Sequence, residues 1–98
     1  YKSAYTIYVA NKMNEPYTFE ASVVGRCCES GDLIQENVKI PCPVRGDVLA
    51  VATTGAYNYS MSSNYNRIRR PPVIMLNKKK SYVAVNRESL DHMISLDV

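Results

Sequence analysis

The residue types best suited to chemistry in this chain stand at residues 28–32, which read Cys-Glu-Ser-Gly-Asp. They follow an alternating apolar run over residues 19–24 that predicts a strand, and Gly25 then breaks the run. A thiol can give or take a proton, and a carboxylate can bind an ammonium group. We therefore expect Cys28 and Glu29 side by side on a short loop between two strands. The alternative is a buried structural cysteine beside a solvated glutamate.

The elements that would hold this loop are mostly strands. The final residues predict a short helix over 90–96, preceded by a capping residue, Asn86 or Ser89, and one helical turn is expected near residues 60–63. The continuous apolar run at 48–52 is typical of a strand buried on both faces. Strands are predicted over residues 5–10, 17–24, 48–52, 73–76 and 82–86, with shorter extended pieces at 33–34 and 38–40. The predicted fold is mainly β: a curled antiparallel or mixed sheet, sandwich- or barrel-like, with one or two short helices.

Composition places the chain among ordinary globular proteins, in one domain over residues 1–98. It is 46% hydrophobic and 21% charged, with a formal net charge of +3. The lysine run 78–80 lies between two predicted strands, which favours a solvated hairpin tip over a nucleic-acid surface. No apolar run approaches the ~20 residues of a membrane-spanning helix.

The three cysteines, at positions 27, 28 and 42, have no metal-ligand spacing, and His92 does not complete a zinc site with them. An odd number of cysteines with adjacent members predicts free thiols in a reducing compartment. We expect a cytoplasmic protein, or a plastid protein if the source is a plant. Because the chain begins with Tyr1 rather than Met and enters a strand at once, we also expect it to be part of a longer protein.

Four segments together resemble the C-terminal domain of the diaminopimelate decarboxylase family, and the match runs from about residue 1 to about residue 87. Relatives that act on ornithine or arginine carry Cys-Asp where this chain has Cys28 and Glu29, so the glutamate favours diaminopimelate. The segments are Cys-Glu-Ser-Gly-Asp at 28–32, Gly-Asp-Val-Leu-Ala at 46–50, Gly-Ala-Tyr-Asn-Tyr-Ser-Met-Ser-Ser-Asn-Tyr-Asn at 55–66 and Arg-Arg-Pro-Pro-Val-Ile-Met at 69–75.

The resemblance implies a two-domain, homodimeric enzyme that depends on pyridoxal 5′-phosphate. It would convert meso-diaminopimelate to L-lysine and CO2, the last step of lysine biosynthesis. The family's N-terminal (β/α)8 barrel, which carries the cofactor lysine, is not in this chain. We therefore expect the chain alone to be inactive, and we assign it no metal site.

The resemblance also implies roles for single residues. Cys28 would be the catalytic proton donor, reaching into the partner subunit's active site. Glu29 would bind the distal ammonium of the substrate, and Tyr57 would contact both cofactor and substrate. Tyr1 falls where the family has a substrate-contacting tyrosine.

Three other functions stay open from the sequence. A related decarboxylase acting on another basic or D-amino acid would share the cofactor and the thiol. A non-catalytic homologue would use the β domain to dimerise or regulate, and a free-standing module would only bind. An intact set of Cys28, Glu29 and Tyr57 argues against the non-catalytic homologue, and the missing start of the chain before Tyr1 argues against the free-standing module.

Overall fold

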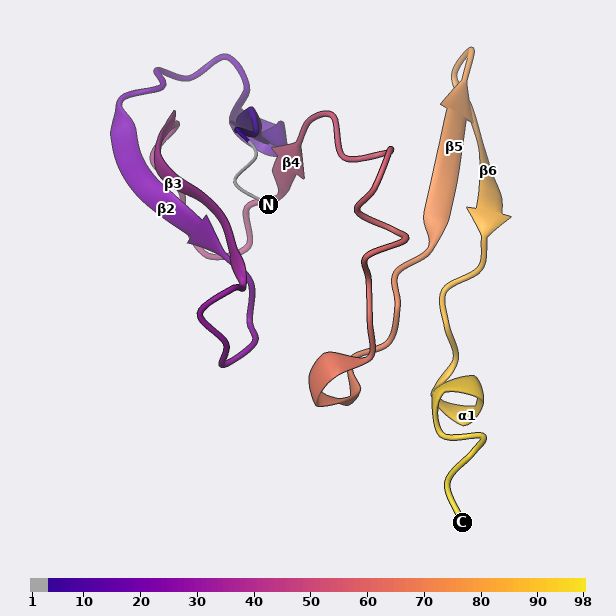
Figure 1. Ribbon diagram of the computed structural model, residues 1–98. Coiled ribbons are helices and arrows are strands. Elements are labelled where there is room, and N and C mark those ends of the chain that lie inside the picture. The colour runs from indigo at the N-terminus through magenta and orange to yellow at the C-terminus, as the bar shows by residue number, and fades with distance from the viewer. Residues whose placement is uncertain (1–3) are drawn as a thin grey trace. The chain divides into compact units, whose positions relative to one another are not determined.

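The computed structural model describes residues 4–98 and is mainly β, as the sequence predicts (Figure 1). Its contacts divide the chain into two compact units, Tyr1–Thr54 and Gly55–Val98. The first unit contains β1 (Ile7–Val9), the 3-10 helix η1 (Ala10–Lys12), β2 (Phe19–Val24), β3 (Leu33–Ile40) and β4 (Leu49–Val51). The second contains the 3-10 helix η2 (Tyr65–Arg67), β5 (Val73–Asn77), β6 (Lys80–Val85) and α1 (Leu90–Met93).

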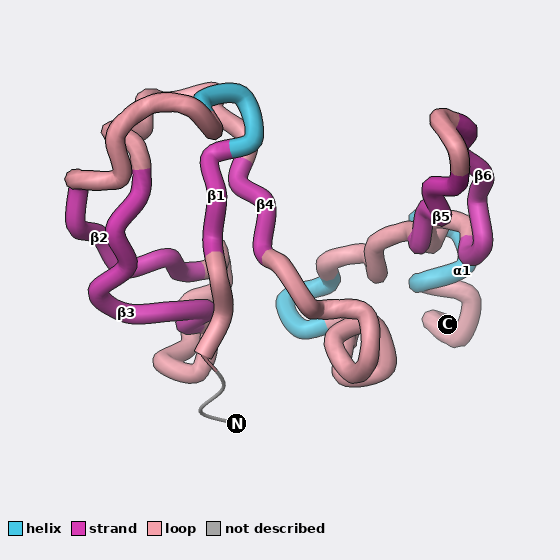
Figure 2. Tube along the Cα trace, turned by 90° about the horizontal axis from the view of Figure 1, so that it is seen from above, coloured by secondary structure: helices cyan, strands magenta, loops and turns pink. Residues whose placement is uncertain are grey.

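The first unit is built from two antiparallel strand pairs. β1 pairs with β4, and β2 pairs with β3 to form a longer, curved ribbon beside them (Figure 2). Alternate side chains of a strand face opposite sides, so Ile7 and Val9 of β1 point inward together. They pack with Val23 and Ile40, which are also buried, and Pro41, next to Ile40, is fully buried as well. This small core is what holds the β2–β3 ribbon in place.

A bulge interrupts the β2–β3 ribbon near its middle. Asn37 has a φ of 54°, and its N–H donates to the Ser22 Oγ at 3.4 Å. Asparagine tolerates this left-handed conformation better than most residues. The two short extended pieces predicted at 33–34 and 38–40 are therefore one strand with a bulge between them.

The prediction that residues 48–52 form a strand buried on both faces is wrong. The strand here is β4, and within the part of the chain that is described it pairs with β1 alone. Val48 is 60% exposed and Leu49 is 41% exposed. A run of apolar residues indicates that a strand is buried, but it does not indicate which part of the protein buries it.

The second unit contains the β5–β6 hairpin, whose tip carries the lysine run as predicted. Lys78 and Lys79 form a two-residue loop, both with positive φ, between the paired Asn77 and Lys80. Two successive residues of positive φ are typical of the type I′ turn that matches the twist of a hairpin.

Helix is sparser in this unit than the sequence predicts. The N–H of Met61 donates to the Tyr57 carbonyl at 3.0 Å, but residues 56–61 form hydrogen-bonded turns rather than the expected helical turn. Ser89 caps α1 as expected, its hydroxyl accepting the His92 N–H at 3.0 Å. The helix ends at Met93 instead of reaching residue 96.

Candidate active site

The predicted catalytic pair lies on the loop that joins β2 to β3, and backbone hydrogen bonds define the shape of that loop. At its neck the Gly25 N–H donates to the Asp32 carbonyl at 2.9 Å. At its tip the Glu29 N–H donates to the Cys27 carbonyl at 2.9 Å, and the Asp32 N–H donates to the Glu29 carbonyl at 3.0 Å. These three bonds make residues 25–32 a closed, tightly turned loop.

The side chain of Asp32 folds into the same loop. Its Oδ2 accepts the backbone N–H of Cys27 at 2.7 Å. A Cβ placed on Gly25 would lie 2.0 Å from Asp32 Oδ1, so the missing side chain of the glycine is what leaves room for the carboxylate. In the sequence, Gly31 and Asp32 together are only a turn signal. The position of Asp32 as the last residue of the motif, after Gly31, was the available signal.

The structure brings Cys28 and Glu29 together at the exposed end of the loop, as predicted. Both side chains are exposed, whereas the adjacent Cys27 is half-buried. A Cβ on Gly31 would lie 2.5 Å from Glu29 Oε2, so this second glycine lets the Glu29 carboxylate approach the backbone. A thiol and a carboxylate are thus presented outward by a loop whose backbone is internally bonded.

The other two predicted site residues are placed differently. Tyr57 belongs to the second unit, where its side chain is 70% exposed. Tyr1 lies outside the described residues. Cys42 is exposed and forms no disulfide.

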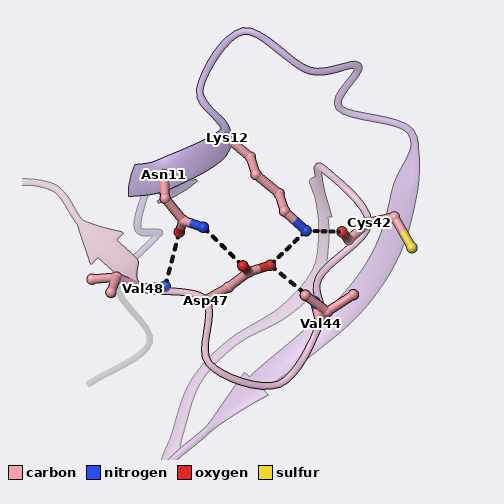
Figure 3. Close-up of polar contacts among 6 residues, drawn as sticks. All are labelled: Asn11, Lys12, Cys42, Val44, Asp47 and Val48. Atoms are coloured by element: carbon pink, nitrogen blue, oxygen red, sulfur yellow. Dashed lines mark hydrogen bonds and ion pairs between the residues drawn. The ribbon is translucent and has the colours of Figure 1, made fainter.

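A second polar cluster, which sequence reasoning missed, lies at the start of β4 (Figure 3). Lys12 Nζ forms an ion pair with Asp47 Oδ2 at 2.8 Å, and Asn11 Nδ2 donates to Asp47 Oδ1 at 2.8 Å. The hydrogen bond from Lys12, followed by those from the Val44 N–H and Asn11, lowers the pKa of Asp47 from 3.8 to about 2. The side chains of Asp47 and Lys12 are only 8% and 18% exposed, which identifies a structural clamp rather than an open site.

Asn11 connects this clamp to the strands. Its Oδ1 accepts the Val48 N–H at 3.0 Å, and the neighbouring Ala10 N–H donates to the Val48 carbonyl at 2.7 Å. The clamp therefore continues the β1–β4 pairing beyond the regular ladder. In the sequence, residues 45–47 are typical of a turn, and nothing there indicates a contact with Asn11.

The described residues offer few groups that could hold a cofactor or a metal by themselves. No cluster of three potential metal ligands occurs among residues 4–98. Lys12 is engaged by Asp47, and Lys39 pairs with Glu20 at 3.2 Å. The remaining described lysines form the hairpin tip.

Comparison with known proteins identifies the protein family of this chain. Residues 1–55 match the family model described as "Pyridoxal-dependent decarboxylase, C-terminal sheet domain". The chain therefore belongs to this family of pyridoxal-dependent decarboxylases.

Individual proteins of this family are similar to nearly the whole chain. The chain is 40% identical over 97 residues to a diaminopimelate decarboxylase of Synechocystis sp., covering 99% of this chain and 21% of that protein. It is 40% identical over 98 residues to the diaminopimelate decarboxylase of Bacillus subtilis, covering 100% of this chain and 22% of that protein. It thus spans about a fifth of the length of these relatives.

Solved structures agree with the sequence comparison. The crystal structure of a diaminopimelate decarboxylase from M. jannaschii superposes with a TM-score of 0.89 at 30% identity, covering 100% of this chain and 22% of that one. A second structure of that protein is a co-complex with L-lysine and gives the same score.

Among the described residues, no helix is both long enough and apolar enough to cross a membrane.

Proposed function

We propose that this chain is the C-terminal β domain, residues 1–98, of an enzyme that decarboxylates meso-diaminopimelate to L-lysine and CO2. The observation that carries the proposal is the outward pairing of Cys28 and Glu29 on the internally bonded β2–β3 loop. Relatives of about 40% identity that bear the name diaminopimelate decarboxylase support the choice of substrate.

Cys28 is the proposed catalytic acid. Pyridoxal 5′-phosphate, when bound, supplies the electron sink that makes loss of the carboxyl group possible. The substrate α-carbon then needs a proton, and the thiol of Cys28, which is exposed at the end of the loop, would deliver it.

Glu29 is the proposed recognition group. Its exposed carboxylate would accept a charge-assisted hydrogen bond from the distal ammonium of the substrate. Because Glu29 follows Cys28 directly, binding the far end of the substrate would also set the distance from the thiol to the reacting carbon. Tyr57, which is exposed, would contact cofactor and substrate, and Tyr1 would contact substrate.

The site so proposed needs partners. The cofactor lysine and the phosphate-binding groups would come from a (β/α)8 barrel preceding this domain, since this chain covers about a fifth of its relatives. Cys28 would act in the active site of the second subunit of a homodimer. A cytoplasmic location is proposed because the three cysteines are unpaired.

The test compares two adjacent cysteines in the complete enzyme. Cys28→Ala should lower kcat for meso-diaminopimelate by ~10²–10⁴-fold, the range typical of a general acid. The matched control, Cys27→Ala, removes a half-buried thiol one residue away and should leave kcat within about twofold. Turnover of Cys28→Ala near that of wild type would refute the catalytic role.

Substrate choice is tested separately. The complete enzyme should release CO2 from meso-diaminopimelate with a far higher kcat/KM than from L-ornithine, L-arginine or D-amino acids. A preference for one of those compounds would replace the proposed substrate while retaining the proposed chemistry. Absence of turnover with all of them, in enzyme that binds pyridoxal phosphate, would indicate a non-catalytic homologue.

A further inference from the structure

We propose that Asp32 is a positioning residue, which orients Cys28 and Glu29 by holding the backbone of Cys27. This inference rests on the proposed function, because it concerns how the proposed acid and recognition group are aimed. No role in the reaction attaches to Asp32 from the sequence or from the proposed mechanism. The geometry of the loop assigns it one.

The side chain of Asp32 forms a hydrogen bond with the backbone of Cys27. Asp32 Oδ2 accepts the Cys27 N–H at 2.7 Å, which is a short bond for an amide donor. Cys27 is the residue directly before the proposed acid, so a fixed Cys27 amide limits the direction in which the next Cα–Cβ bond points. A hydrogen bond to a carboxylate is roughly twice as strong as one between neutral groups.

The backbone of Asp32 also forms hydrogen bonds at the neck and at the tip of the loop. Its carbonyl accepts the Gly25 N–H, and its own N–H donates to the Glu29 carbonyl. One residue thus contacts the neck, the residue before Cys28 and the residue after it. If its side chain swung away, the tip would keep only the bond between Glu29 and Cys27 and the bond from the Asp32 N–H.

The carboxylate of Asp32 occupies the space beside Gly25, which has no side chain. A Cβ on Gly25 would lie 2.0 Å from Asp32 Oδ1 and 2.2 Å from Oδ2, closer than real side chains approach. The end of an aspartate can rotate, so Gly25→Ala would displace the carboxylate rather than the backbone. Gly25, which directly follows β2, and Asp32, which ends the motif, therefore act as a pair.

A displaced loop has a defined kinetic consequence. Misplacing a reacting group by about 1 Å can lower a rate ~10²-fold, so Asp32→Ala in the complete enzyme should lower kcat by ~10–100-fold. Asp32→Asn keeps an oxygen acceptor for the Cys27 N–H and should recover most of that loss. Glu36→Ala removes an exposed acidic residue of the same hairpin and serves as the control, with kcat within about twofold of wild type.

Two double variants separate positioning from a general structural role. In a Cys28→Ala background, Asp32→Ala should change kcat by less than about twofold, because the proposed acid, whose orientation would affect kcat, is already gone. Gly25→Ala should reproduce the Asp32→Ala phenotype. Gly25→Ala combined with Asp32→Ala should be no worse than Asp32→Ala alone, since the alanine removes the clash.

Hydrogen exchange gives a readout that does not depend on turnover. In Asp32→Ala and in Gly25→Ala the Cys27 amide should exchange at least ~10-fold faster than in wild type, with the β2–β3 ladder amides unchanged. If Asp32→Ala does not fold, Gly25→Ala carries both measurements. Unchanged Cys27 exchange, or a kcat within twofold of wild type in Gly25→Ala, overturns the inference.

The outcomes also separate this inference from the proposed function. If Cys28→Ala is silent, the proposed function fails, and with it the basis for a positioning role. If Cys28→Ala is severe while Asp32→Ala opens the Cys27 amide without lowering kcat, only the inference about Asp32 fails. A severe effect of both variants that is not additive supports the two together.

Discussion

The clamp formed by Asp47 makes the acid stability of the first unit predictable. Asp47 is nearly buried, pairs with Lys12 and accepts hydrogen bonds from Val44 and Asn11. All of these contacts favour its charged form, which is why the pKa of Asp47 falls to about 2. The perturbation to test is a fall in pH, compared between wild type and Asp47→Asn.

The sign follows from proton linkage. The pKa of Asp47 is lower in the folded chain than its ordinary value of 3.8, so its stabilising contribution is complete above about pH 4. That contribution is lost as the pH falls toward 2. Near pH 3 the group would be about 10% protonated when folded and about 85% when unfolded, so unfolding takes up ~0.8 proton at this residue.

The assay is urea unfolding of the 98-residue chain at intervals from pH 6 to pH 2. Asp47→Asn should have a lower urea midpoint than wild type at pH 6, and most of this difference should be lost as the pH falls from about 5 to 2. Asp97→Asn is the control. Its ion pair with Arg67 is exposed, and exposed pairs contribute little to stability.

Two results would refute this reasoning. A wild-type minus variant difference that stays constant from pH 6 to pH 2 would show that the contribution of Asp47 does not depend on its charge. A direct titration of the Asp47 carboxyl carbon by NMR with a midpoint near 3.8 would show that the Lys12 contact does not persist in solution.

Three further predictions concern the proposed site and the hairpin. Glu29→Gln in the complete enzyme should lower kcat/KM for meso-diaminopimelate by ~10–100-fold, because a charge-assisted hydrogen bond is worth ~1.5–3 kcal/mol; an unchanged kcat/KM would remove Glu29 from recognition. Tyr57→Phe should raise the Kd for pyridoxal phosphate or the KM for substrate ~2–10-fold, the value of one neutral hydrogen bond, and unaltered constants would show that the hydroxyl is idle. Lys79→Gly should raise the free energy of unfolding by about 1 kcal/mol, since its φ of 65° strains any residue with a Cβ. Lys80→Gly, at a strand position, should lower that free energy instead, and equal effects of the two substitutions would contradict the turn assignment.

Local backbone chemistry is what the sequence by itself determined. The lysine run marked a hairpin tip, Ser89 marked the start of a short helix, and Gly25 marked the end of a strand. Each of these signals acts within a few residues, so its outcome does not depend on distant parts of the chain. The pairing of Cys28 and Glu29 on one loop was predictable for the same reason.

Only the tertiary structure decided which distant residues meet. Asn11 and Asp47 are 36 residues apart, and nothing in either segment indicates the other. The apolar run at 48–52 predicted burial, yet exposure depends on which surfaces of the whole molecule cover a strand. The carboxylate of Asp32 shows the same limit at short range. Its sequence position showed a turn, but its contact with the Cys27 amide required the exact closing of the β2–β3 ribbon and the empty space at Gly25.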